Sequence, residues 1–299
     1  MKIKITDEYN NKKLLDLLRG TLGFSRAAAT ALKVREDGIL LNGEHVTVRA
    51  VLHTGDELSL GIEDREEDVN GHILPVDLPL DIIYEDENVV CVNKPFGMPT
   101  HPTHGHYGDT LANALAHYYG ELGIPFVFRA VNRLDRDTSG VVLVAKNQAA
   151  ADYLAAQVRR RSIGKTYVAV CHGVLPECGR IEGYIRRLGD SIITRGLFPQ
   201  GEESEYSLTT YERLSLGDSY SVIECTPVTG RTHQIRVHLS SSGHPIYGDG
   251  LYGVEDGMGR QALHASSLTF DLPFYGRSIT VSAPVADDIT KLIEDLNEN

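Results

Sequence analysis

The sequence contains no tryptophan, no Cys-x-x-Cys pair and no apolar run near the roughly 20 residues that a membrane-spanning helix needs. Its first residues, MKIKITDEYNNKK, lack the apolar centre of a secretory signal peptide. We therefore expect a cytoplasmic protein with no membrane partner. The cysteines sit in or near apolar stretches, so we expect them to be reduced and mostly packed; they are Cys91, Cys171, Cys178 and Cys225.

A basic balance, which is usual in nucleic-acid-binding proteins, is also missing, because the formal net charge is -12 and the sequence pI is about 5.4. Acidic residues concentrate at 61–88 and 286–299, whereas basic clusters stand at 157–165 and 184–190. Ligand binding depends on local fields, whereas net charge mainly governs solubility and long-range steering. The charge therefore weakens the case for an RNA partner without excluding it.

The length of 299 residues is enough for one large and one small domain. Residues 1–61 predict the small domain, because helix-like segments with Ser25 as an N-cap precede a strand, an Asn-Gly turn and further strands. Residues 62–80 are acidic and contain proline, which is typical of a linker. Residues 81–299 form the predicted large domain.

The large domain is predicted to be α+β, with a mostly antiparallel mixed sheet and flanking helices, because its strands and helices do not alternate regularly. Residues 108–122 predict a helix with Asp109 as N-cap, and residues 148–161 predict a helix whose last turn is basic. The apolar spacing at residues 233–239 fits either a strand or a helix, and Gly243 would end a helix well.

The segment VNRLDRDTSG, residues 131–140, puts charge at the mouth of an apolar run that predicts a buried strand. Asp135 lies between Arg133 and Arg136, and cations this close favour a charged carboxylate. An ionised aspartate can act as a nucleophile or as a general base. An ordinary charged turn before a strand explains the same local pattern.

Two further segments carry side chains that suit RNA. Arg231 follows Gly230 in a predicted tight turn, where its planar guanidinium could clamp a carboxylate or a phosphate. Lys165 and Tyr167 begin a predicted strand and point to one face of it, as in a platform for a base and its phosphate. A surface arginine and an edge-strand tyrosine are the plainer interpretations.

The loop at residues 92–110 is rich in proline, glycine and histidine. His101, His104 and His106 lie in it, but no cysteine or regular histidine spacing supports zinc. We therefore expect a polar loop near an active site rather than a metal site.

Five segments, in this order along the chain, resemble the sequence blocks of the RluA-type pseudouridine synthases. They are VNKPFGMPTH at 92–101, NRLDRDTSGVVLVAKN at 132–147, KTYVAVCHG at 165–173, GRTHQIRVHLSSSGHPIYGDGLYG at 230–253 and QALHASSLTFDLP at 261–273. Any one block is moderately specific, but five in order are very specific. The resemblance implies an α+β synthase domain that flips a uridine out of RNA structure and isomerises it to pseudouridine with no cofactor and no metal.

The resemblance also assigns roles by position. Asp135 is implied as the essential carboxylate, either a nucleophile at C1′ or the base of a glycal route, and Arg231 as its ion-pair partner. Tyr167 is implied to stack on the target uracil and to help the proton step at C5, and Arg133 to fill the gap left by the flipped base. The implied pocket walls are Ile235 and Leu263, and the implied phosphate contacts are Arg159, Arg160, Arg161 and Lys165.

Residues 12–60 resemble a small RNA-binding domain first described in a ribosomal small-subunit protein, and this likeness implies that Ser25 and Arg26 contact RNA. The catalytic block departs from the family pattern at Asn132, where the family usually has histidine. Asparagine still donates and accepts hydrogen bonds, but it does not titrate near neutral pH. We therefore expect activity to survive and count Asn132 among the residues that place the RNA.

The implied substrate is large-subunit ribosomal RNA, with transfer RNA as the alternative; we expect no DNA partner and a monomer. Two other functions stay open. A non-catalytic RNA-binding or ribosome-assembly protein would not need Asp135, Tyr167 and Arg231 together. A retaining glycosidase using Asp135 and Asp137 would need the carboxyl groups roughly 5–5.5 Å apart, and the chain lacks a tryptophan-rich sugar platform.

Overall fold

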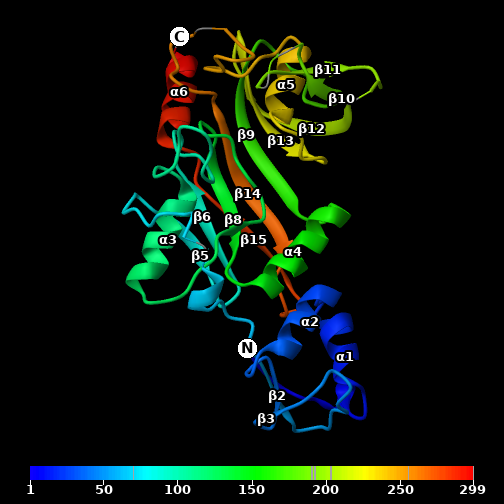
Figure 1. Cartoon of the computed structure of the whole chain (residues 1–299). Helices are drawn as coiled ribbons and strands as arrows, with labels where there is room; N and C mark the ends of the chain where they lie inside the picture. The colour runs from blue at the N-terminus through cyan, green and yellow to red at the C-terminus, as the bar shows by residue number, and fades with distance from the viewer. Residues whose placement is uncertain (70, 190, 192, 203, 255, 299) are drawn as a thin grey trace.

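The computed structural model, which describes residues 1–69, 71–189, 191, 193–202, 204–254 and 256–298, places the N-terminal residues around a small sheet of their own (Figure 1). Four strands pair antiparallel in the order β1-β4-β2-β3. The strands are β1 (Lys2–Lys4), β2 (Ile39–Leu41), β3 (Glu44–His45) and β4 (Glu57–Leu60). The helices are α1 (Leu14–Asp16), which continues as a π-helical turn at Leu17–Thr21, and α2 (Arg26–Val34), with 3-10 turns at Asp7–Tyr9 and Glu66–Asp68.

Local sequence signals set these N-terminal elements. The Ser25 hydroxyl accepts a hydrogen bond from the Ala28 amide at 3.0 Å and so caps α2. Asn42 and Gly43 both take positive φ, 54° and 86°, in the tight turn that joins β2 to β3. Fully buried leucines such as Leu14 and Leu18 fill a core between this sheet and its helices.

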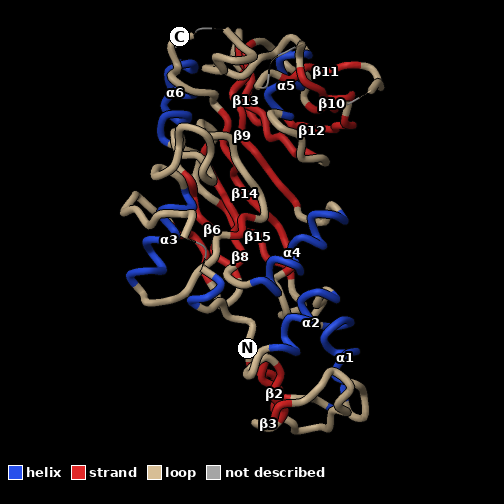
Figure 2. Tube along the Cα trace, viewed as in Figure 1, coloured by secondary structure: helices blue, strands red, loops and turns tan. Residues whose placement is uncertain are grey.

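The remaining strands form one large sheet. They are β5 (Ile82–Glu85), β6 (Val89–Lys94), β7 (Arg129–Ala130), β8 (Ser139–Ala145), β9 (Gly164–His172), β10 (Cys178–Arg187), β11 (Arg195–Phe198), β12 (Glu205–Leu216), β13 (Tyr220–Pro227), β14 (Leu263–Asp271) and β15 (Ser278–Ser282). Their order is β11-β10-β12-β13-β9-β14-β8-β6-β5, with β15 paired to β14 and β7 to β8 (Figure 2). Among the pairs recorded for the described residues, only β8 and β14 run parallel. The predicted α+β fold with a mostly antiparallel mixed sheet is confirmed.

Helices α3 (Leu111–Glu121) and α4 (Gln148–Arg160) cover opposite faces of the large sheet. Successive side chains of a strand alternate between faces, so Val90 of β6 packs on the α3 side and Val89 on the α4 side. The predicted N-cap of α3 was wrong by one residue. The hydroxyl of Thr110, rather than Asp109, accepts the hydrogen bond from the Asn113 amide.

The ambiguous apolar segment is helical and forms α5 (Gln234–Ser241), and Gly243 follows it with a φ of 85°. Six consecutive residues of α5, 234–239, are buried. A helix that is buried on all sides shows neither the alternation of a strand nor the one-sided apolar stripe of a surface helix, so its sequence pattern is ambiguous. The last helix is α6 (Asp287–Glu298). No helix in the described part of the chain is long and apolar enough to cross a membrane. All four cysteines are free, and three of them are buried.

The N-terminal part packs against the outer side of α4. Phe24 stacks on Phe274, which follows β14, with ring centroids 5.2 Å apart, and the Ser25 hydroxyl donates a hydrogen bond to Asp152 of α4. Gly23 has a φ of 66° and lies against the ring of Tyr153, where a Cβ would come within 2.7 Å of the ring. Helix α4 therefore separates the small sheet from the large one (Figure 1).

Candidate active site

A cleft of about 1630 Å³ opens over the large sheet. Most of its walls come from the loop after β6, the β7–β8 loop, the end of α4 with the start of β9, the turn before α5 with the first residues of α5, and two segments at 248–254 and 256–263. The cleft thus gathers parts of all five sequence blocks that resemble the synthase family. Asp135 lies in it, on the β7–β8 loop.

The backbone around Asp135 is fixed by short-range contacts. The Thr138 amide donates to the Asp135 carbonyl at 3.1 Å and closes the turn before β8. Gly140 has a φ of 113°, and a Cβ there would lie 2.2 Å from the Ala265 carbonyl oxygen, so only glycine lets β8 meet β14. The fully buried Lys94 ammonium donates to the Arg136 carbonyl at 3.1 Å. The Thr-Ser-Gly turn and Lys94 therefore hold the backbone of Asp135 in one place.

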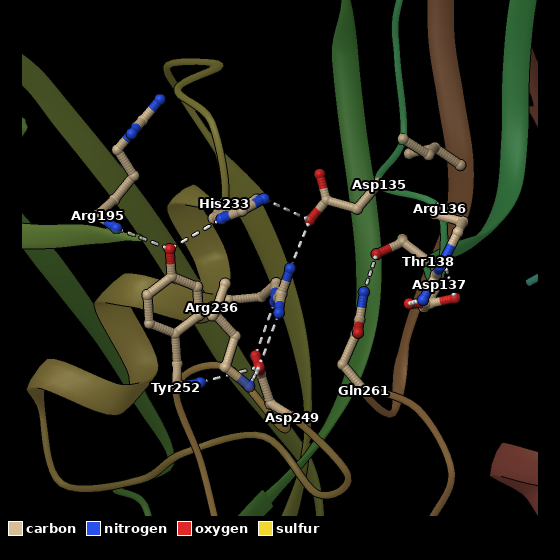
Figure 3. Close-up of polar contacts among 12 residues, drawn as sticks. Asp135, Arg136, Asp137, Thr138, Arg195, His233, Arg236, Asp249, Tyr252 and Gln261 are labelled. Atoms are coloured by element: carbon tan, nitrogen blue, oxygen red, sulfur yellow. Dashed lines mark hydrogen bonds and ion pairs between the residues drawn. The ribbon is translucent and has the colours of Figure 1, made fainter. Parts of the chain in front are cut away.

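Arg236 of α5 is the ion-pair partner of Asp135 (Figure 3). Its Nη1 donates to Oδ2 of Asp135 at 3.0 Å, and its Nε and Nη2 both donate to Asp249 at 2.7 Å. Burial opposes the charge of Arg236, but the ion pairs with Asp249 and Asp135 outweigh burial and raise its pKa. The side chains of Arg236 and Asp249 are only 9% and 1% exposed, so the guanidinium is oriented before any substrate binds.

The predicted pairing of Arg231 with Asp135 was wrong. Arg231 lines the cleft, but its guanidinium donates to the Glu205 carboxylate and, at 3.1 Å, to the Tyr206 carbonyl. The Gln234 side-chain oxygen accepts a hydrogen bond from the Arg231 backbone amide at 3.1 Å, which closes the turn before α5. The Arg231 guanidinium then lies against β12. A sequence signal for Arg236 was present: an arginine between apolar neighbours in a buried segment needs a nearby carboxylate.

The predicted residues of β9 also lie in the cleft. Lys165 and Tyr167 line it, as do the proposed walls Ile235 and Leu263, which are 5% and 4% exposed. Burial and then the charge of Asp135 raise the pKa of Tyr167, so its hydroxyl is protonated near neutral pH. Burial lowers the pKa of Lys165. The strand period puts both side chains on one face, as predicted from the sequence.

Two residues at the site were not singled out from the sequence: His233 lines the cleft, and Tyr252 contacts His233. His233, the residue before α5, lies with its Nε2 3.8 Å from Oδ2 of Asp135, and its Nδ1 is 2.8 Å from the Tyr252 hydroxyl. Tyr252 also accepts a hydrogen bond from the Arg195 amide at 2.9 Å. Both residues lie inside the fourth sequence block, but their spacing alone does not bring them to Asp135.

Asn132 lines the cleft, but its amide is hydrogen-bonded to the backbone of β8, and its role in placing RNA stays a prediction. Its Nδ2 donates to the Val141 carbonyl at 3.1 Å, and its Oδ1 accepts from the Leu143 amide at 2.8 Å. The side chain is buried and braces β8. Arg133, the next residue, is exposed on the rim of the cleft, where its Nη1 lies 3.3 Å from Nε2 of His101.

The other residues that were expected to contact RNA are not part of the Asp135–Arg236 ion pair. Arg159 and Arg160 are exposed on the last turn of α4, and Arg161 lines the cleft just after it. Arg26 is exposed on α2, but the Ser25 hydroxyl is occupied by its two contacts with the Ala28 amide and Asp152. Ser25 therefore joins the N-terminal part to α4, and the expectation that it binds RNA is corrected.

The histidine loop contributes His101 and His106 to the lining of the cleft and has contacts of its own. His106 pairs with Asp109 at 2.6 Å, and Nδ1 of His104 lies 3.4 Å from the Tyr107 hydroxyl. Asp137, the second carboxylate of the glycosidase alternative, is held by two hydrogen bonds from Arg136. No group of three or more metal-binding side chains occurs among the residues that the structure describes.

This fold, with a carboxylate–arginine pair in a cleft across a mixed sheet, belongs to the class of pseudouridine synthases. The chain is a member of the RNA pseudouridylate synthase family, which matches residues 88–241. The Bacillus subtilis (strain 168) protein called uncharacterized RNA pseudouridine synthase YjbO is 38% identical, over 93% of this chain and 97% of that protein. Ribosomal large subunit pseudouridine synthase D of Neisseria meningitidis serogroup A is 34% identical, over 91% of this chain and 75% of that protein.

Solved structures agree with this assignment. Human RNA Pseudouridylate Synthase Domain Containing 4 superposes with a TM-score of 0.60 at 25% identity, over 73% of this chain and 93% of that one. Human RNA Pseudouridylate Synthase Domain Containing 1 gives 0.57 at 27%, over 74% and 96%. The family predicted from five sequence blocks is confirmed, and the protein is an RNA pseudouridine synthase, an isomerase.

Proposed function

We propose that this enzyme isomerises specific uridines of large-subunit ribosomal RNA and that Asp135 is its essential carboxylate. The observation that carries the proposal is the geometry of Asp135, which is 30% exposed in the cleft with only Oδ2 held by Arg236. Relatives named ribosomal large subunit pseudouridine synthase D support ribosomal RNA as the substrate. Transfer RNA is the alternative.

The reaction needs no external reagent. The bond from C1′ to N1 breaks, the uracil turns while bound, a bond from C1′ to C5 forms, and the proton lost from C5 is balanced by one gained at N1. Asp135 acts either by attacking C1′ or by removing a proton in a glycal route. Tyr167 stacks on the uracil and helps the proton step at C5, and its hydroxyl is neutral because burial and the charge of Asp135 raise its pKa.

The target uridine reaches this cleft by flipping out of the RNA, at a cost of a few kcal/mol of unstacking. The cleft of about 1630 Å³ has room for a nucleotide and its neighbours. Arg133 on the rim takes the place of the flipped base, and the N-terminal residues 1–61 form a second RNA-binding unit joined by residues 62–80 to the catalytic residues 81–299.

The test is pseudouridine mapping in cells that lack the gene, with the wild-type chain or Asp135→Asn restored. We expect one or a few pseudouridines of large-subunit ribosomal RNA to vanish and to return only with the wild type. RNA from the deletion strain, treated with each purified protein, gives the same answer without interference from related enzymes. Sites in transfer RNA would refute the substrate, and restoration by Asp135→Asn would refute the catalytic assignment.

A further inference from the structure

His233 is held in an unusual conformation beside the carboxylate. Its φ is 56° and its ψ is 21°, the left-handed region that glycine or asparagine occupies more easily than histidine. Its side chain is 14% exposed and faces Asp135, with Arg236, Arg195 and Asp249 as the other charged groups around it. A bulky residue in this backbone conformation at an active site suggests that the imidazole itself is needed.

The hydrogen bonds of Tyr252 decide where the imidazole proton is. The Arg195 amide can only donate, so the Tyr252 oxygen is the acceptor of that bond. The hydroxyl proton of Tyr252 then goes to Nδ1 of His233, which is the other recorded partner among the described residues. Nδ1 is therefore an acceptor, and a neutral ring carries its proton on Nε2.

The Nε2 atom of this tautomer lies near one oxygen of Asp135, without a hydrogen bond to it. Nε2 lies 3.8 Å from Oδ2, the same oxygen that accepts from Arg236 at 3.0 Å (Figure 3). Burial, helped by the guanidinium groups of Arg236 and Arg195, lowers the pKa of His233 despite the charge of Asp135, in keeping with a neutral ring. Arg236 is thus the hydrogen-bonded donor to Oδ2, Nε2 of His233 stands beyond hydrogen-bond distance of the same oxygen, and Oδ1 has no recorded partner among the described residues.

We propose that His233 is a positioning residue, locked by Tyr252 as its Nε2–H tautomer, which keeps an N–H facing Oδ2 of Asp135 beside the Arg236 hydrogen bond and leaves Oδ1 to act on the nucleotide. This inference rests on the proposed role of Asp135. The hydrogen bonds from the Arg195 amide to Tyr252 and from Tyr252 to His233 also tie β11 to the imidazole.

The test compares His233→Asn with His233→Gln in single-turnover pseudouridine formation on saturating RNA. Asparagine suits the backbone but its amide does not reach the Nε2 position, so we expect a rate about 10-fold lower with unchanged or higher resistance to unfolding. Glutamine places a donor near Nε2, so its rate is expected within about 3-fold of the wild type. RNA affinity is expected to be unchanged in both, and His72→Asn, on the exposed linker, is the matched control.

Tyr252→Phe tests the tautomer lock. In the wild-type background this change is expected to lower the rate about 3-fold. In the His233→Gln background it is expected to leave the rate unchanged, because the glutamine amide donates without depending on a tautomer. The inference would be overturned if His233→Asn kept the wild-type rate or if the Asn and Gln variants lost the same rate. It would also be overturned if the effects of His233→Gln and Tyr252→Phe on the rate were additive. Asp135→Asn, in the same assay, separates the two proposals: if it keeps the wild-type rate, the role of Asp135 itself fails.

Discussion

The polar residues in and around the cleft fall into two contrasting groups. In the paired side (His233, Arg236, Asp249 and Tyr252) the side chains of His233, Arg236 and Asp249 are 14%, 9% and 1% exposed, and the polar groups are hydrogen-bonded or ion-paired with one another or with Asp135. The open side (Arg159, Arg160, Arg161 and Lys165) has no carboxylate within ion-pair distance among the described residues, and its three arginines are exposed.

The difference separates two uses of positive charge. A buried guanidinium that is compensated by two carboxylates has no remaining capacity for phosphate, but it fixes the geometry of its partner. Uncompensated surface cations release counterions when they meet phosphates, and so supply affinity without ordering the reacting atoms. We therefore expect the paired side to govern the chemical step and the open side to govern RNA binding. The acidic net charge fits this division, since only part of the surface meets RNA.

Loss of Arg236 should have the largest effect. Arg236→Ala is expected to lower the single-turnover rate about 100- to 1000-fold, as for other lost charge-stabilising donors. It should also lower the free energy of unfolding by about 3–5 kcal/mol, because Asp249 stays buried without its partner. Arg231→Ala, which breaks an ion pair with the exposed Glu205, is the matched control and should change unfolding by about 0–1 kcal/mol.

Arg236→Met combined with Asp249→Leu separates folding from catalysis in this prediction. Removing both buried charges should restore much of the stability, whereas the rate should stay low because Asp135 has lost its anchor. Equal rates for the Arg236 and Arg231 variants would contradict the observed pairing.

Loss of charge on the open side should weaken binding and leave the chemistry alone. With Arg159, Arg160 and Arg161 all changed to Gln, RNA affinity at physiological salt is expected to fall about 10- to 100-fold. The slope of log affinity against log salt should become shallower by roughly 2, since each lost phosphate contact removes about 0.7–0.9. Filter binding across a salt series measures both, with Lys291→Gln on the exposed face of α6 as control. An unchanged slope would show that these arginines are not part of the RNA footprint.

Acid should lower the free energy of unfolding, and this is the smallest of the three predicted effects. Burial lowers the pKa of His238 on α5 and of His264 on β14 to about 4, and both side chains are fully buried. In the folded chain their pKa lies below the ordinary value, so on acidification the unfolded chain binds protons first. The free energy of unfolding is therefore highest above about pH 6.5 and falls as the pH falls towards 4. At pH 5.5 the expected loss is about 1 kcal/mol for each histidine.

Urea unfolding at pH 7.5 and pH 5.5 measures the acid effect. Replacing the exposed His45 by Gln should leave the difference between the two pH values unchanged. A free energy of unfolding that is flat over this interval would show that neither histidine is kept neutral by burial.

The sequence predicted the fold and the family because several features each have one simple physical reading. Asn42-Gly43 can hardly be anything but a tight turn, and residues 141–145 are apolar at every position of a buried strand. Asp135 could be singled out because its block combines charge, a Thr-Ser-Gly turn and a following strand. These are local properties, and local sequence carries them.

The errors concern contacts that depend on where a side chain points in three dimensions. The period of residues 233–239 was ambiguous, and only the helix turns Arg236 inwards and Arg231 towards Glu205. Ser25 was expected to meet RNA, but the carboxylate of Asp152 holds it instead, and Asn132 lines the cleft with its amide bonded to the backbone of β8. Pairing between residues about 100 positions apart, such as Asp135 and Arg236, leaves no trace in a single local pattern.

The most direct test measures, on one large-subunit ribosomal RNA fragment, both the single-turnover rate at saturation and the dissociation constant. The samples are the wild type, the Arg236→Met/Asp249→Leu pair and the triple arginine variant of the open side. The account predicts that the first variant loses rate but keeps affinity, and that the second loses affinity but keeps rate. If both variants lose the same quantity, the division of the cleft into a side for chemistry and a side for binding is wrong.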